Sequence, residues 1–167
     1  MAVVVGVLTA CSLAPSTDHG PIRNPKVLMS ATSRYDAARF AGHWVTRADF
    51  AGDWRVTAFD FAAPKAVRAG AWREQGVGGE PARVAQVSAD QPAVFTLTYD
   101  GLPRQSRQMV VLWVDEGFRT AVLSTRDGSY AWIADRKATG GADRVIAARQ
   151  MLDHNGFDTT QLRGALE

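Results

Sequence analysis

The sequence predicts an all-β protein, an eight-stranded antiparallel up-and-down barrel with one C-terminal α-helix packed outside it. Three observations predict this fold. From Phe40 onward the chain runs in short segments in which apolar and polar residues alternate, which is the period of a strand with one buried face. The connections between these segments alternate in composition, and a single segment with helical spacing follows the last one.

Eight strands are predicted, separated by residues typical of turns. They cover residues 43–48, 54–61, 65–73, 82–88, 93–99, 106–114, 118–125 and 129–137. The connections after the first, third, fifth and seventh strands contain ADFAGD, EQGVGGE, DGLPRQ and RDGS, whereas the others contain AAPK, SADQP and DEG. Successive connections of such a barrel fall at opposite ends. The Gly-rich set is therefore expected around an open mouth and the other set at a closed end.

One amphipathic helix is predicted after the eighth strand, in GGADRVIAARQMLDHNGFD. Asp143 is expected to cap its N-terminus, and Gly156 stands where the helix ends. Val145, Ile146 and Leu152 recur at helical spacing, so this stripe is expected to pack on the outside of the sheet.

The single cysteine, Cys11, follows ten uncharged, mostly small and apolar residues. That stretch is too short to cross a bilayer as a helix, which needs roughly 20 apolar residues. The residues LTACS resemble the lipobox of bacterial lipoproteins. The resemblance implies that residues 1–10 are part of a lipoprotein signal and that Cys11 is acylated as the mature N-terminus. Ser12, in place of Asp, implies an outer-membrane location, lipid-anchored and facing the periplasm.

Residues 11–34 are interpreted as the lipidated N-terminus and a flexible tether, because they contain three prolines and several Ser and Thr with little periodicity. Residues 35–167 form one domain, which is long enough to bury a core. Lys and Arg number 19 against 17 Asp and Glu, a net charge of +2 without charged runs. Nucleic acid is therefore not expected as a partner.

The motifs resemble those of the lipocalins, and in particular of the bacterial outer-membrane lipocalins. FAGHW (residues 40–44) matches their G-x-W opening, DEGFRTAVL (115–123) resembles their second motif and RDGSYAWIADR (126–136) their third. HNGFDTTQL (154–162) is similar to the tail of the bacterial members. Residues 49–104 have no close match, so the walls of the pocket are the part least defined by the resemblance.

Four residues of these motifs are expected to form the closed end: Gly42, Trp44, Asp115 and Arg136. Gly42 allows a sharp turn into the first strand. Trp44 then fills the narrow end, and the Arg136 guanidinium can lie over its indole, a contact that contributes about 1 kcal/mol or somewhat more.

The inner wall of the cup is assigned by strand alternation. Tyr130 and Trp132 share a strand face with Arg136 and are expected to face inward. The alternation of the family implies the same for Val110, Leu112, Val114, Ala121 and Leu123. Arg104, Arg107 and Arg126 lie around the Gly-rich connections, where a carboxylate or phosphate head group could meet them.

Catalysis is not expected. His19 lies in the tether, His43 points away from the Trp44 face and His154 stands at the helix end, so Ser124, Thr125 and Ser129 near the mouth have no histidine as a base. The acidic pair Asp115 and Glu116 is typical of a tight turn. The chain has no Cys and His cluster with metal-ligand spacing, and no cofactor is expected.

The resemblance therefore implies a carrier that binds a small hydrophobic or amphiphilic ligand, such as a fatty acid or lysophospholipid, for storage or transport. An alternative is a barrel filled by its own side chains, acting as a structural or protein-interaction module of the cell envelope. Binding of a tetrapyrrole or another pigment is a third option, although no histidine is placed to ligate haem iron.

Overall fold

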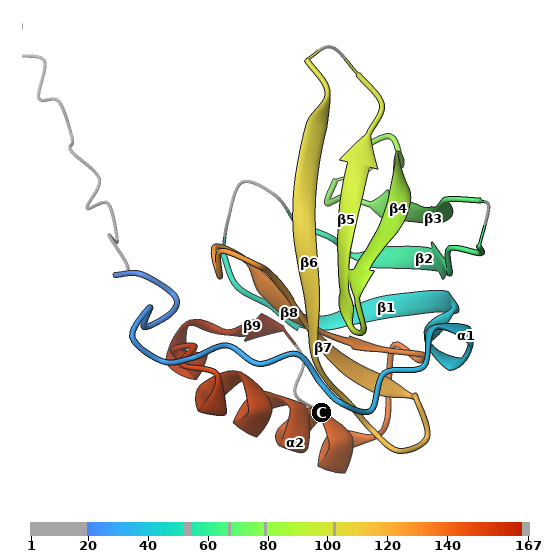
Figure 1. Cartoon of the computed structure of the whole chain (residues 1–167). Helices are drawn as coiled ribbons and strands as arrows, with labels where there is room; N and C mark the ends of the chain where they lie inside the picture. The colour runs from blue at the N-terminus through green and yellow to red at the C-terminus, as the bar shows by residue number, and fades with distance from the viewer. Residues whose placement is uncertain (1–19, 52–54, 67, 79, 102, 165–167) are drawn as a thin grey trace, which may run out of the picture.

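The computed structural model describes residues 20–51, 55–66, 68–78, 80–101 and 103–164. They form a closed antiparallel barrel with one long helix outside it (Figure 1). Each strand pairs with the next along the chain, and β1 pairs with both β2 and β8, which closes the sheet. The predicted eight-stranded up-and-down barrel is confirmed. Its strands are β1 (Gly42–Asp49), β2 (Ala58–Ala62), β3 (Gly70–Gln75), β4 (Arg83–Gln91), β5 (Val94–Tyr99), β6 (Gln105–Val114), β7 (Thr120–Thr125) and β8 (Ala131–Asp135).

Four strands begin two or more residues later than the alternation predicts, at Ala58, Gly70, Thr120 and Ala131. Ahead of β3, Lys65 and Arg68 donate backbone hydrogen bonds to each other at 2.9 and 3.0 Å, so this segment is a tight turn. Ahead of β7, Phe118 has a φ of +56° and donates to the Asp115 carbonyl at 2.9 Å. Local turn hydrogen bonds therefore replace strand pairing at the starts of β3 and β7.

The two ends of the barrel differ as predicted. The Gly-rich connections β1–β2, β3–β4, β5–β6 and β7–β8 lie at one end, which we call the mouth. The short helix α1 (Ala37–Phe40) and the β6–β7 turn lie at the other. The tips of β5 and β6 project at the top of Figure 1, at the mouth.

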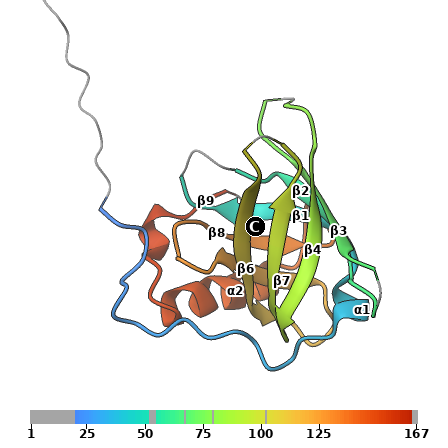
Figure 2. The same ribbon diagram turned by 45° about the horizontal axis from the view of Figure 1, so that its top comes forward.

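The helix α2 (Ala142–His154) packs outside the barrel against β6, β7 and β8 (Figures 1 and 2). Two expectations about it are wrong. Its N-cap is Gly141, with a φ of +72°, and Asp143 lies in the first turn without capping it. Ile146 is 53% exposed, and Ala148 instead completes the buried face with Val145 and Leu152, because positions three and four residues apart share one side of a helix. Gly156, with a φ of +84°, ends the helix as expected.

Residues 20–34, assigned to the tether, form a strap that lies along the barrel (Figure 1). Gly20 and Pro21 line a cavity with the β7–β8 connection, so the strap starts at the mouth. Asn24 donates a backbone hydrogen bond to the Gly156 carbonyl at 2.8 Å, and Thr32 donates one to the Val111 carbonyl at 2.9 Å. The strap then continues to α1 at the closed end. A two-residue strand, β9 (Arg163–Gly164), pairs with β1.

The core has two parts on the two faces of the sheet. One cluster fills the barrel interior and contains Phe59, Trp72 and Trp132. The other lies between the outer face of the sheet and α2 and includes Val145 and Leu152. No helix among the described residues is long and apolar enough to span a membrane. Cys11, Ser12 and His19 lie outside the described residues.

Candidate functional site

The closed end is built around Trp44 on β1. Its side chain is fully buried, its Nε1 donates to the Phe40 carbonyl at 2.8 Å, and the Arg136 Cζ lies 3.8 Å from the centre of its ring. Gly42 has a φ of +105°, and a Cβ there would lie 3.2 Å from Arg136 Nη1. The glycine is therefore required both by its backbone conformation and by the approach of the guanidinium.

Arg136 also holds the segment that crosses the closed end. Its Nη2 donates to the carbonyls of Arg39 and Ala41, both at 2.9 Å, and its Nη1 donates to the His43 carbonyl at 2.8 Å. The Asp115 carboxylate accepts the Thr120 amide at 2.7 Å, which closes the β6–β7 turn, and such backbone donors hold the pKa of Asp115 below its usual value even though burial opposes them. These groups close the end of the barrel away from the mouth.

Aromatic rings fill the lower and middle interior. The Phe59 and Trp72 rings stack with centroids 4.1 Å apart, and Trp132 meets both in edge-on contacts at 6.1 and 6.4 Å. Tyr130 lies 5.3 Å from Trp132. Val114, Ala121, Leu123, Tyr130 and Trp132 all belong to this interior cluster, as their strand phase predicts. Their part in ligand binding stays a prediction.

Val110 and Leu112 do not face inward, and their assignment to the inner wall is wrong. Both belong to the cluster under α2, whereas Met109 and Val111 face the interior. A β-bulge shifts the β6–β7 register between Val111 and Trp113. Because a bulge inserts one extra residue, the alternation read back from Val114 is inverted beyond it.

Polar side chains replace the rings at the mouth. We call Glu74 on β3, Arg83 on β4, Tyr99 on β5 and Arg107 on β6 the mouth layer. Strand pairing places all four on the inner face: Glu74 faces Arg83 across β3–β4, and Arg107 faces the buried Leu97 across β5–β6. Glu74 Oε1 lies 2.6 Å from Arg83 Nη2, and Oε2 accepts the Tyr99 hydroxyl at 3.0 Å and Trp72 Nε1 at 2.7 Å.

Glu74 is buried completely, and burial raises the pKa of its carboxyl although these donors and the charges of Arg83 and Arg107 oppose the shift. Burial and the neighbouring Glu74 also raise the pKa of the Tyr99 hydroxyl, which stays protonated at neutral pH. The mouth layer therefore holds two guanidinium groups and one carboxylate beside the aromatic interior.

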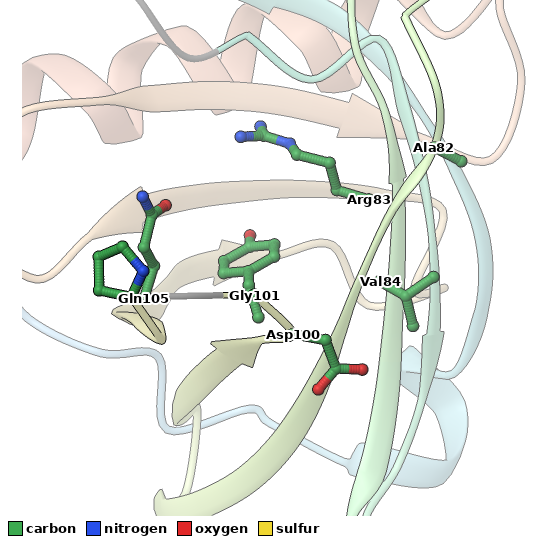
Figure 3. A pocket seen from close by; sticks show the side chains of 8 residues that line it. Ala82, Arg83, Val84, Asp100, Gly101 and Gln105 are labelled. Carbon is green, nitrogen blue, oxygen red and sulfur yellow. The ribbon is translucent and has the colours of Figure 1, made fainter.

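Two cavities open beside this layer. One, of about 510 Å³, is lined by Arg83, Val84, Tyr99, Asp100, Pro103 and Gln105 among others. The second, of about 390 Å³, shares Arg83, Tyr99 and Gln105 and adds Ser106 and Arg107. Figure 3 shows Arg83 and Gln105 directed toward one space while Val84 and Asp100 point away from it. The Arg83 side chain thus lines both cavities, and Arg107 lines the smaller one.

The three arginines predicted to meet a head group are placed differently. Arg107 is half-buried and lines the second cavity. Arg126 is exposed and shares with Arg107 a further cavity of about 500 Å³ at the end of β6 and β7. Arg104 is exposed in the β5–β6 connection and lines none of these cavities. Only Arg107 belongs to the mouth layer.

A second polar cluster closes the other side of the mouth. Asp49, 3% exposed, accepts two hydrogen bonds from Arg55 at 2.7 and 3.0 Å and one from the Tyr130 hydroxyl at 3.2 Å. The same hydroxyl accepts the Val56 amide at 3.2 Å. The Asp49 carboxylate and the Arg55 guanidinium pair with each other. The cluster therefore joins the end of β1 to Arg55, Val56 and Tyr130.

The sequence analysis missed Glu74, Arg83 and Tyr99. A signal for them exists: Glu74 is two residues from Trp72, Arg83 is two residues from Ala85 and Tyr99 is two residues from Leu97. Charged and hydroxyl groups in phase with an apolar inner face predict a polar layer where the strands reach the mouth. The described residues contain no group of His, Cys, Asp and Glu side chains that could hold a metal ion.

Comparison with solved structures bears on the fold. Lobster apocrustacyanin A1 superposes with a TM-score of 0.61 at 15% identity over 77% of each chain, and apocrustacyanin C1 with 0.60 at 14% identity over 76% of this chain and 77% of that one. H1 crustacyanin from the lobster Homarus americanus gives 0.60 at 14% identity over 87% of each chain. The fold is lipocalin-like. No protein-family model and no curated protein matches the sequence. The barrel fold is thus shared at the level of structure.

Proposed function

We propose that this protein is a carrier for a small hydrophobic or amphiphilic ligand, such as a fatty acid or lysophospholipid. The observation that carries the proposal is the mouth layer, in which Arg83, Arg107 and Tyr99 stand between an aromatic interior and two cavities. The acyl chain of the ligand would cover apolar surface, which contributes roughly 25 cal/mol per Å² removed from water. The polar end would meet the arginines.

The size of the cavities supports a ligand of this class. At about 510 and 390 Å³ they fall within the roughly 300–1,000 Å³ that is common for small-molecule sites. They lie above the packed rings of Trp72 and Trp132, so the ligand would bind in the upper barrel. Its depth of insertion depends on how far these rings move apart.

Delipidated protein is expected to bind medium or long acyl chains saturably, with a change in tryptophan emission. Trp72 is the expected reporter because its Nε1 donates to Glu74 in the mouth layer. Trp72→Phe should therefore lose most of the emission change while a displaced dye still reports binding. Trp113→Phe, whose side chain packs on the α2 side of the sheet, should keep the change. Titration by fluorescence and by dye displacement measures both.

The filled barrel is the competing function, and the stacked interior favours it. Trp44, Trp72 and Trp132 are fully buried and their neighbours lie at ring-packing distances. If no acyl chain binds saturably by either measurement, the carrier proposal is wrong. The protein would then act as a structural or protein-interaction module.

We also propose that the chain is a bacterial lipoprotein, anchored through Cys11 to the outer membrane and facing the periplasm. The support is the LTACS motif. Two or more acyl chains are needed for stable anchoring, since each buried CH₂ contributes about 0.8 kcal/mol and a single chain is marginal. Neither a cofactor nor a catalytic step is part of the proposal, and His43, paired with the exposed Asp60 at 2.9 Å, lies on β1 toward the closed end.

Cys11→Ser is expected to move the protein from the membrane fraction to the soluble fraction of cells. Ser12→Ala, which leaves the cysteine in place, should stay with the membranes after a salt wash. Intact mass of the wild-type protein should show acyl chains on Cys11. An unmodified thiol, or a Cys11→Ser variant that sediments like wild type, would show that the protein is not a lipoprotein.

A further inference from the structure

Between β4 and β5, the backbone pairing of the barrel wall stops short of the mouth. The β4–β5 ladder ends at the pair Ala85–Tyr99, whereas β4 continues to Arg83 on its β3 side. Beyond the last pair, Arg83 and Val84 of β4 and Tyr99 and Asp100 on the β5 side line the cavity of about 510 Å³ (Figure 3). We call this cavity the β4–β5 slot.

The slot joins the outer surface to the upper interior of the barrel. Because Arg83 faces inward, its neighbour Val84 faces outward, and it is 46% exposed. Three residues of the slot also line the inner cavity of about 390 Å³, namely Arg83, Tyr99 and Gln105. The two cavities therefore meet at these three side chains and form a path through the wall.

The Arg83 side chain spans this path. Its Nη2 lies 2.6 Å from Glu74 Oε1, and its Cζ lies 5.7 Å from the centre of the Tyr99 ring on β5. The side chain is 44% exposed, so it can turn toward solvent without being desolvated. Glu74 then keeps its hydrogen bonds from Trp72 Nε1 and the Tyr99 hydroxyl. Rotation of one side chain thus opens the contact that bridges β4 and β5 beyond their ladder.

We propose that the β4–β5 slot is the entrance for the ligand and that Arg83 is its gate. The proposal rests on the proposed carrier function and specifies the route: an acyl chain reaches the upper barrel sideways, between two strands. On the other side of the mouth, hydrogen bonds join Asp49, Arg55 and Tyr130, and Tyr130 is only 3% exposed. A side chain that must rotate before the ligand enters lowers the rate of association.

The first test closes the slot covalently. In a full-length Cys11→Ser chain, Val84→Cys with Asp100→Cys places two thiols at the position that follows the last ladder pair. Oxidation, or a short bis-maleimide where the thiols lie too far apart for a disulfide, joins β4 to β5 across the slot. The matched control is Gln86→Cys with Thr98→Cys, a pair already inside the ladder. Its cross-link leaves the slot as it is.

Stopped-flow fluorescence with cis-parinaric acid, a fatty acid that is itself fluorescent, measures the rates of binding and release. The cross-linked slot variant should take up the probe at least about tenfold more slowly than the same variant before cross-linking, within the range over which association rates vary at one site. Reduction of the disulfide should restore the rate. The cross-linked control should bind at the rate of the uncross-linked protein.

The second test removes the gate. Arg83→Ala should raise both the association rate and the dissociation rate of the probe. If Arg83 served only to bind the head group, the variant would release the probe faster without taking it up faster. N-phenyl-1-naphthylamine, which is uncharged, repeats the measurement without the attraction between the arginine and a carboxylate. The matched control is Arg68→Ala, the same change at an exposed position of the β2–β3 connection, which should leave the rates unchanged.

An unchanged association rate in a slot variant whose cross-link is verified by intact mass overturns the inference and leaves the carrier function intact, because the ligand then enters along the barrel axis. If the cross-link does not form or the variant unfolds, Arg83→Ala decides: faster association of both probes supports the gate, and an unchanged or slower rate overturns it. If neither probe binds the wild-type protein, both the inference and the carrier function are wrong.

Discussion

Trp44→Ala is expected to lower the free energy of unfolding by about 3–5 kcal/mol, the range for deleting a buried aromatic side chain. The indole is fully buried between the Phe40 ring, at 4.9 Å, and the Phe59 ring, at 6.2 Å. Its loss leaves a cavity at the narrow end of the barrel that strands joined in a closed sheet cannot collapse to fill. Urea denaturation followed by circular dichroism measures the change.

Arg136 should be coupled to Trp44 in this measurement. The guanidinium lies 3.8 Å from the ring centre, so part of its stabilisation is lost when the ring is removed. The double variant Trp44→Ala with Arg136→Ala should be less destabilised than the sum of the single variants by at least about 0.5 kcal/mol. Trp44→Ala with Arg126→Ala, at the opposite end, should be additive. Additivity in both pairs would mean that the stacking contact contributes nothing of its own.

Asp135→Ala is expected to cost about 3 kcal/mol, because it leaves a largely buried guanidinium and a buried hydroxyl without their acceptor. The Asp135 carboxylate is 1% exposed and accepts from Thr120 Oγ1 at 2.5 Å and from Arg144 Nη2 at 3.3 Å. Arg144 lies on α2, so these contacts join the helix to the closed end of the barrel. The same denaturation experiment measures the loss.

The matched control is Asp143→Ala. The Asp143 carboxylate lies 4.0 Å from the same Arg144 guanidinium, yet its side chain is 84% exposed. An exposed ion pair contributes little, so this variant should stay within about 0.5 kcal/mol of wild type. Equal losses for the two variants would contradict the assignment of Asp135 as the group that anchors α2.

The strand count, the strand order and the two unlike ends of the barrel follow from short-range rules. Alternation every two residues marks a strand with one buried face, and Gly-rich connections mark the mouth. These rules need only neighbouring residues, which is why they place Trp132 on β8, and Tyr130 just before it, inward correctly. The stack of Arg136 on Trp44 joins the two strands that close the barrel, and it was expected from the resemblance as well as from strand phase.

The predictions are wrong or incomplete in two situations. In one, a single extra residue inverts the inward and outward alternation of a strand, and in the other, the contacts of a residue are distant in the sequence. The bulge between Val111 and Trp113 inverts the faces of Val110 and Leu112, and nothing in the alternation before it marks the extra residue. The donors around Glu74 come from three strands, so their convergence depends on register. The strap has no helical or strand periodicity, so its sequence predicts a tether. Its position depends on hydrogen bonds to Gly156 and Val111, which are distant in the sequence.

The start of the strap at the mouth has a consequence for how an anchored molecule stands on a bilayer. Eight residues separate Cys11 from Gly20, and the nine steps along the chain span about 30 Å when fully extended and about 15–18 Å as a flexible coil. The ten residues of β6 extend roughly 33 Å from the mouth to the closed end. If Cys11 is acylated, as proposed, its anchor therefore lies within this distance of the mouth. A lipid that leaves the bilayer would then meet the mouth layer before any other part of the barrel.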